Sequence, residues 1–349
     1  VIYVLWGMTY TIMDIPYWSM IPTLATTKED REKISVVPRI FASLGGLTVT
    51  TFGIALVNKL GNGNQIKGFE YFALGIVIIF IISTIVTCIN VKEKTQVQVN
   101  NEKVNIKQAF NILKQNDQLL VFIGIVLGMN LIMQISGSMA IYYFTYVVGK
   151  ESLFSVYQAF AGIAEISGLV LLPILTKKIG REDVFKFGSI LPIAGFLLLF
   201  VAGIVAPQNA LFIGMAGAIL KLGSGFLLGS TTIMLADVVD YGEFKLGTRN
   251  ESIVFSVQTL LVKGASAVAG WLVGVGLSLV GYVAGEVQSA TTILGMRVIM
   301  IWIPIVCAIV MYTIYKSKYK INGKFHDDML VELEKRKKCK RIRYEYFVL

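Results

Sequence analysis

A tyrosine, an aspartate and a tryptophan follow one another at intervals of four residues in the stretch "TYTIMDIPYWSM". On a helix Tyr10, Asp14 and Trp18 share one face, and Thr11 lies beside them. A carboxylate accepts hydrogen bonds from hydroxyl groups, and an indole ring can cover the C–H face of a sugar. We therefore expect this face to bind a neutral polyol. The alternative is a structural aspartate bonded to a neighbouring helix, with the aromatic rings at a membrane interface.

Further polar residues interrupt apolar segments elsewhere in the chain. Arg39, at the start of an apolar block, could pair with Asp14 or line the same cavity, or it could extend to the membrane surface. In "SVQTLLVKGASAVAG", Gln258, Thr259 and Lys263 lie on one side of a helix. A lysine deep in an apolar block needs a carboxylate, a ligand or water, and a purely structural ion pair is the alternative.

Two segments, "TTKEDREK" and "LADVVDYGEFKLGTRNES", carry charges of both signs. We expect both to be loops on one side of the membrane. Facing loops of this kind can close a pathway through ion pairs that break in another state; the alternative is a pair of solvated loops. The candidate gate residues are Arg31, Glu32, Asp237, Asp240, Glu243 and Arg249.

Two opposite charges are expected at the same depth in the membrane. Glu165 and Lys221 each lie 12 residues into an apolar block that starts outside, near Leu153 and Asn209 respectively. At a rise of 1.5 Å per residue both are about 18 Å deep, close to the bilayer midplane. Because an unpaired charge is costly there, we predict that the two form an ion pair. The alternative is that each faces a water-filled cavity separately, or that the span boundaries differ by a turn.

The elements that must position these residues are membrane-spanning helices. The chain of 349 residues is 55% hydrophobic and 15% charged, whereas soluble proteins are about 25% charged. Nine apolar blocks reach the ~20 residues that a helix needs to cross a bilayer. They lie near 1–24, 36–58, 69–90, 119–147, 153–175, 184–206, 209–235, 251–281 and 291–315. The fold class is therefore an all-α polytopic membrane protein.

The basic residues indicate the orientation of these spans. Alternate loops and the C-terminal tail carry 24 Lys and Arg, whereas the intervening loops carry 3. The positive-inside rule places the first set, with the tail, in the cytoplasm. The net charge of +10 thus reflects topology and not a nucleic-acid surface. Val1 is then outside, and an odd number of further spans is expected upstream, because transporters built from repeated halves have both ends inside.

The domain organisation follows from the same pattern. Residues 1–90 are expected to form three helices of an N-terminal bundle, 91–118 a cytoplasmic linker, 119–315 a six-helix bundle and 316–349 a basic tail. The tail is either solvated or in contact with anionic lipid. One histidine, His326, and three scattered cysteines give no metal-ligand spacing and no nucleophile–base pair, so neither a cofactor nor an integral-membrane enzyme is expected.

Five stretches resemble the glycoside–pentoside–hexuronide cation symporters, a family with the major facilitator fold. They are "WGMTYTIMDIPYWSMIPT", "PRIFASLGG", "AIYYFTYVVG", "LADVVDYGEFKLGTRNESIVFSVQTLLVKGASA" and "YKINGK". The similarity runs from Val1 to about Gly323. It implies a twelve-helix transporter, of which this chain holds helices four to twelve.

The resemblance also implies roles for individual residues. Sugar-site positions match Asp14, Trp18, Tyr10 and Arg39 in the N-terminal bundle, and Lys263, Gln258 and Thr259 in the C-terminal bundle. Thr11 and Asp14 match the cation site, and the six candidate gate residues match a cytoplasmic charged network. The chain departs from the family pattern where Leu228 replaces a tryptophan and where Glu165 and Lys221 replace asparagines. The family's acidic cation ligands lie on its first three helices, which are not in this sequence.

The implied function is secondary active symport in a bacterial cell membrane. Na⁺ (or H⁺ or Li⁺) and a galactoside such as melibiose would bind between two bundles that rock to expose the site to each side in turn. The expected partners are thus a sugar, a monovalent cation and the lipid bilayer. The alternatives are another glycoside, a pentoside, a hexuronide or a lipid-like solute as substrate, or an inactive truncated remnant.

Overall fold

The computed structural model describes residues 2–19, 28–91, 112–248 and 251–348, and every regular element in these ranges is helical. The predicted all-α fold class is confirmed. The chain divides into two compact units, Val1–Lys103 and Val104–Leu349.

The first unit contains α1 (Ile2–Ser19), α3 (Lys28–Leu60) and α4 (Gln65–Asn90). A tight turn joins α3 to α4, with Asn62 and Gly63 at positive φ. The Asn64 side chain then caps α4 by accepting hydrogen bonds from the backbone N–H groups of Ile66 and Lys67, at 3.1 and 3.3 Å. A Cβ on Gly68 would lie 2.2 Å from the Val57 carbonyl oxygen. Glycine therefore allows the two helices to approach closely beside the turn.

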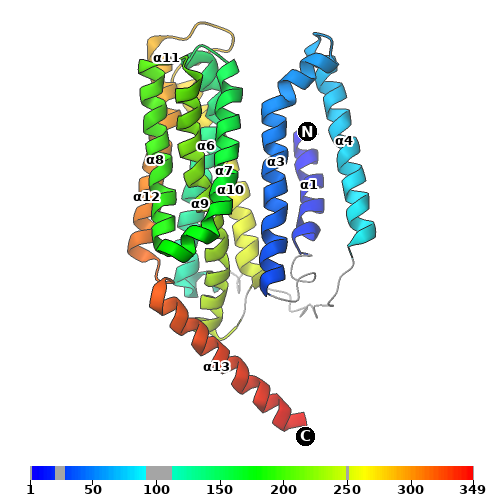
Figure 1. Ribbon diagram of the computed structural model, residues 1–349, viewed down its shortest axis with the longest axis vertical. Helices are drawn as coiled ribbons and strands as arrows, with labels where there is room; N and C mark the ends of the chain where they lie inside the picture. Colours follow the sequence, from blue (N-terminus) through cyan, green and yellow to red (C-terminus); the bar gives the residue numbers. More distant parts are fainter. Residues whose placement is uncertain (1, 20–27, 92–111, 249–250, 349) are drawn as a thin grey trace. The chain divides into compact units, whose positions relative to one another are not determined.

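The second unit is an upright helical bundle (Figure 1). The short helix α11 lies at one end of the bundle, and α13 leaves from the other end. Its elements are α6 (Asp117–Tyr142), η1 (Tyr143–Val147), α7 (Ser152–Ile179), α8 (Arg181–Val205), α9 (Ala210–Leu246), α10 (Glu251–Leu279), α11 (Ala290–Arg297), η2 (Val298–Trp302), α12 (Ile303–Lys318) and α13 (Gly323–Val348). The segments η1 and η2 are π-helical and continue α6 and α11 without a break.

Helix α9 is the centre of packing in this unit, because both α7 and α8 pack along it. Small residues bring the backbones together, as expected for helices in lipid. A Cβ on Gly225 of α9 would lie 2.4 Å from the Glu165 carbonyl oxygen of α7, and one on Gly168 would lie 2.6 Å from the Leu222 carbonyl oxygen. On the other side, a Cβ on Gly195 of α8 would lie 2.5 Å from the Leu220 nitrogen.

Eight helices of the described chain are long and apolar enough to cross a membrane. They run over Phe41–Leu60, Gln65–Asn90, Asp117–Val147, Ser152–Ile179, Arg181–Val205, Ala210–Leu246, Ile253–Leu279 and Ala290–Lys318. They correspond to the last eight of the nine predicted spans. The first predicted span is also helical, as α1, but it is not among the eight, because its Tyr, Thr, Asp and Ser residues lower its hydropathy.

The two predicted charged loops are largely helical, which corrects the sequence interpretation. Helix α9 extends through Asp237, Asp240 and Glu243 to Leu246, and α3 begins at Lys28. Charged side chains do not end a helix once it has left the hydrocarbon. Helix α9 ends instead at Gly247, whose φ of 73° is the left-handed conformation typical of a glycine C-cap.

We predict that Gly225→Ala destabilises the bundle. The methyl group would meet a backbone carbonyl of α7, which cannot rotate away, and overpacking of this kind costs about 1–3 kcal/mol. Thermal unfolding of the purified protein in detergent should show a lower midpoint.

Gly137→Ala on α6 is the matched control, because no atom beyond the adjacent backbone of α6 itself lies within 4 Å of the added Cβ. An equal loss of stability in both variants would show that the close approach of α7 and α9 is not the cause.

Candidate functional site

The polar face of α1 has the geometry that the spacing predicts. The Tyr10 phenol and the Asp14 carboxylate are close enough to interact electrostatically. One turn earlier, Trp6 stacks on Tyr10 with ring centroids 5.7 Å apart and an interplanar angle of 24°. Sequence reasoning missed Trp6, although it continues the same four-residue spacing. The side chains of Thr11 and Trp18 lie outside the described residues, so their roles stay predictions.

The other predicted sugar-site residues lie on α3 and α10. Arg39 belongs to α3, but its side chain is outside the described part. On α10, Gln258 is half-buried, while Thr259 and Lys263 are exposed. The Thr259 hydroxyl donates to the Phe255 carbonyl oxygen at 3.1 Å. Because α1 and α10 belong to different units, their convergence on one cavity stays a prediction.

The predicted pair between Glu165 and Lys221 is present. Lys221 Nζ of α9 donates to Glu165 Oε2 of α7 at 2.8 Å, and the two side chains are 22% and 16% exposed. The pair lies beside the close approach at Gly168 and Gly225. Counting residues from the ends of the two spans was enough to predict this contact, because the rise of a helix per residue is fixed.

Asp237 of the predicted gate has partners that the sequence did not suggest. Its carboxylate accepts from Arg181 Nη1, which lies 3.4 and 3.3 Å from its two oxygens, and it lies 3.2 Å from His326 Nε2. Arg181 begins α8 and His326 lies in the first turn of α13, so three helices meet at one carboxylate. His326 was expected in a polar tail, yet its side chain is 13% exposed.

A small pocket adjoins this carboxylate. Its lining includes Thr176, Ser230, Tyr315, Tyr319 and Asn322 beside Arg181 and Asp237. Tyr319 follows α12, and burial raises the pKa of its phenol well above the usual range. The phenol therefore stays neutral at physiological pH.

The other gate residues remain untested. Asp240 and Glu243 lie half-buried on α9. The side chains of Arg31 and Glu32 on α3 are outside the described part, and so is Arg249. Whether the two charged segments face each other stays a prediction.

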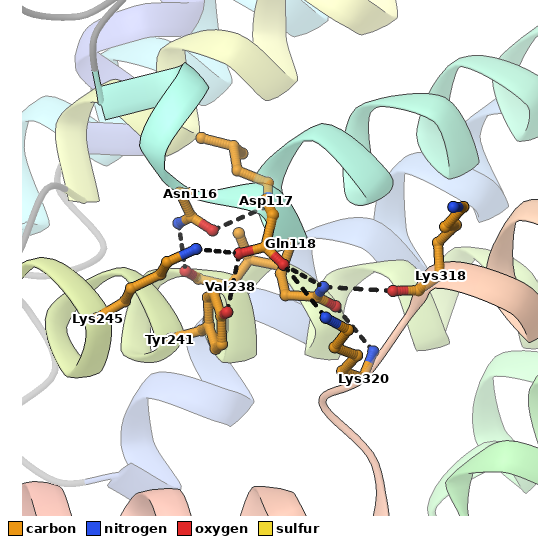
Figure 2. A network of polar contacts seen from close by, with 9 residues as sticks. Asn116, Asp117, Gln118, Val238, Tyr241, Lys245, Lys318 and Lys320 are labelled. Carbon is orange, nitrogen blue, oxygen red and sulfur yellow. Dashed lines mark hydrogen bonds and ion pairs between the residues drawn. The ribbon is translucent and has the colours of Figure 1, made fainter.

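A second polar network ties the start of α6 to α9 and α12 (Figure 2). Asp117 accepts a hydrogen bond from the Tyr241 hydroxyl at 2.9 Å and pairs with Lys245, while Lys320 Nζ lies 3.9 Å from its other oxygen. Gln118 donates to the Lys318 carbonyl oxygen at 3.3 Å and accepts from the Lys320 backbone N–H at 2.8 Å.

Asn116 completes this network. Its side-chain oxygen accepts from the Leu119 N–H at 3.0 Å and caps α6, while its side-chain nitrogen donates to the Val238 carbonyl oxygen at 3.2 Å. The sequence "NDQ" therefore satisfies a free backbone N–H at the buried start of α6 and fixes two other helices at the same time. Helix-capping rules predict the first of these roles but not the second.

The chemistry available in these sites is binding and conformational change. Within the described ranges, no group of three or more His, Cys, Asp or Glu residues could hold a metal ion. The described residues are helical in every regular element and hold eight candidate spans with polar residues inside them, which defines a polytopic membrane protein.

The chain belongs to the MFS/sugar transport protein family, whose model matches residues 1–323. This is a family of transport proteins and not of enzymes. The chain is similar to the isoprimeverose transporter of Lactiplantibacillus pentosus, with 29% identity over 94% of this chain and 68% of the relative. It also matches the raffinose carrier protein of Pediococcus pentosaceus, with 27% identity over 96% of this chain and 53% of the relative.

A third relative is a lactose permease of Lactobacillus delbrueckii subsp. bulgaricus, with 29% identity over 95% of this chain and 55% of the relative. The chain thus spans about half to two thirds of the length of these three proteins. The predicted major facilitator class is confirmed, whereas the melibiose assignment is not specifically supported.

We predict that Glu165→Gln or Lys221→Gln alone destabilises the protein, since each leaves a partly buried charge without its partner, at a cost of about 1–3 kcal/mol. The double variant with asparagine at both positions, which restores two neutral amides, should recover stability. The measurement is the thermal midpoint and the folded yield in detergent. A double variant no better than the worse single variant would contradict a direct partnership.

Proposed function

We propose that the protein is part of a sugar–cation symporter that works by alternating access. The observation that carries the proposal is the match of a sugar-transport family over residues 1–323, in a chain whose α1 places Tyr10 beside Asp14. In this proposal Asp14 accepts hydrogen bonds from sugar hydroxyls, and Trp18 stacks on the C–H face of the ring. Tyr10 orients the carboxylate.

The remaining sugar contacts come from the other predicted positions. Arg39 completes the N-terminal side, and Lys263, Gln258 and Thr259 supply donors and acceptors from α10. The half-buried and exposed positions of the α10 residues are compatible with contact to a substrate.

The proposed substrate is a neutral galactoside such as melibiose. A hexuronide carries a carboxylate and would need an unpaired basic group in the cavity. Lys221, the extra basic residue of the second unit, is already paired with Glu165 at 2.8 Å, so it does not add a free cation for a substrate carboxylate. Another glycoside or a pentoside is the alternative. Leu228 stands where the family has a tryptophan, and this difference weakens the assignment to melibiose itself.

The proposed coupling ion is Na⁺, with H⁺ or Li⁺ as alternatives. Thr11 and Asp14 would contribute to its site. If bound cation raises sugar affinity, thermodynamic linkage requires sugar to raise cation affinity by the same factor. Uptake of a labelled sugar panel with and without Na⁺ tests both the substrate and the ion.

The proposed orientation places the C-terminal tail and the charged ends of α3 and α9 in the cytoplasm, as the distribution of Lys and Arg indicates. The candidate gate would then close the pathway on that side. Arg31, Glu32 and Arg249 would supply partners for the acidic residues of α9.

We predict that Asp14→Asn abolishes sugar binding by the transporter while leaving membrane insertion intact. The amide keeps the size of the side chain but loses a charge-assisted acceptor worth about 1.5–3 kcal/mol. Trp18→Tyr should bind more weakly than the parent but better than Trp18→Ala, since an aromatic face survives. Binding of a labelled α-galactoside to membranes measures both effects, and unchanged binding in Asp14→Asn would remove Asp14 from the site.

We also predict that neutralising Arg31 or Arg249 shifts the balance between inward-open and outward-open states by about 1–3 kcal/mol. Cysteine-accessibility labelling from both sides of the membrane would report the shift. Lys150→Gln, outside the charged segments, is the control. Identical labelling of the Arg31 and Arg249 variants and the parent would refute the gate.

A further inference from the structure

The docking of α13 on the bundle depends on a small group of side chains. On its buried face, Met329 and Leu333 are 1% and 4% exposed and belong to the hydrophobic core. Arg336 Nη1 donates to the Phe244 carbonyl oxygen at 2.9 Å, and its guanidinium lies 5.1 Å from the Phe244 ring centroid. The first four turns of α13 thus contact the bundle, and Arg336 reaches the far end of α9.

One contact of this docked helix is ionisable near neutral pH. His326 Nε2 lies 3.2 Å from Asp237 Oδ1 on α9, and Nδ1 lies 3.6 Å from Asp327 Oδ1 on α13 itself. From α8, Arg181 approaches the same Asp237 carboxylate at 3.3 Å. Tyr319 also faces Asp237, but its phenol stays neutral. The charged groups around the imidazole are therefore two carboxylates and one guanidinium.

The electrostatics of this group favour a charged imidazole. The hydrogen bond that the His326 imidazole donates to Asp237 is the main cause that raises the pKa of His326 above its ordinary value of 6.5, while burial and Arg181 oppose the shift. A group whose pKa is raised in the docked state stabilises that state when it is protonated. This stabilisation is complete below about pH 6.5 and is lost as the pH rises through the raised pKa of the docked histidine.

We propose that His326 is a proton-sensitive latch that holds α13 against α8 and α9 through Asp237. When the imidazole is protonated, it forms a charge-assisted bond to a carboxylate that is only 9% exposed. Deprotonation removes one of the two cations that compensate Asp237 and leaves the other, Arg181, which is 47% exposed and belongs to α8. The link from α13 to the bundle weakens, while the link between α8 and α9 persists.

The latch can be tested without measuring transport, so its failure would be distinct from failure of the proposed function. His326 is the only histidine in the sequence, and its imidazole signals in a histidine-labelled NMR sample are unambiguous. The purified protein, carrying a non-histidine affinity tag, is titrated in detergent. The expected pKa lies above 6.5. A pKa at or below 6.5 would overturn the proposal.

A second measurement follows the helix itself. Cys339 is the only cysteine of α13, so replacing Cys88 and Cys307 with serine leaves it as a single site for a spin label. The mobility of the label should rise as the pH increases through the pKa of His326. In His326→Gln, which cannot become charged, mobility should be high and independent of pH across the same range. A pH-independent parent, or an unchanged titration in His326→Gln, would exclude the latch.

Two carboxylate variants identify the partner. Asp237→Asn should lower the histidine pKa toward 6.5 and abolish the pH-dependent change in mobility. Asp327→Asn is the matched control, because the Asp327 side chain is 80% exposed and its interaction is screened by water. If Asp237→Asn does not fold, the comparison of the parent with His326→Gln still decides the question. An equal shift in the two carboxylate variants would refute Asp237 as the partner.

Discussion

Hydrocarbon offers no hydrogen bonds to a polypeptide backbone, and this constraint explains most of the architecture. Every described regular element is a helix, which satisfies its own N–H and C=O groups. Several hydroxyl side chains in the spans are also satisfied within their own helix. Ser136, Ser189 and Thr231 donate to carbonyl oxygens four residues earlier at 2.7, 2.9 and 2.9 Å. Other polar groups find a partner on another helix.

These interhelical contacts give the second unit much of its specificity. Lipid competes with apolar side chains for helix surfaces, so close packing and polar contacts determine which helices meet. Glycines bring α7 and α9 into backbone contact, and the Glu165–Lys221 pair lies beside that contact. Asp237 binds residues of α8 and α13, while Asp117 binds Lys245 of α9 and Lys320 in the segment after α12. In this unit, carboxylates thus connect helices that are far apart in the sequence.

Features that depend on helix geometry alone were predictable from the sequence. The spans follow from apolar length, the shared face of Tyr10 and Asp14 from four-residue spacing, and the Glu165–Lys221 pair from depth. The extension of α9 was not predictable from hydropathy, because water-exposed helix and loop share a polar composition. The contact of His326 with Asp237 also escaped prediction, since it depends on how α12 and α13 turn back toward α9. For the candidate sugar site, the sequence predicts which residues share a face of one helix but not their distance from another bundle.

The length of α9 has a mechanical consequence. Its 37 residues correspond to about 55 Å at 1.5 Å per residue, well beyond the ~30 Å of the hydrocarbon layer. A continuous helix of this length acts as a lever: a tilt of about 5° around one end displaces the other end by about 5 Å. Lys245 and Phe244, which contact Asp117 and Arg336, lie at the far tip of this lever. A small tilt within the membrane would therefore be enlarged where α9 meets the polar contacts outside it.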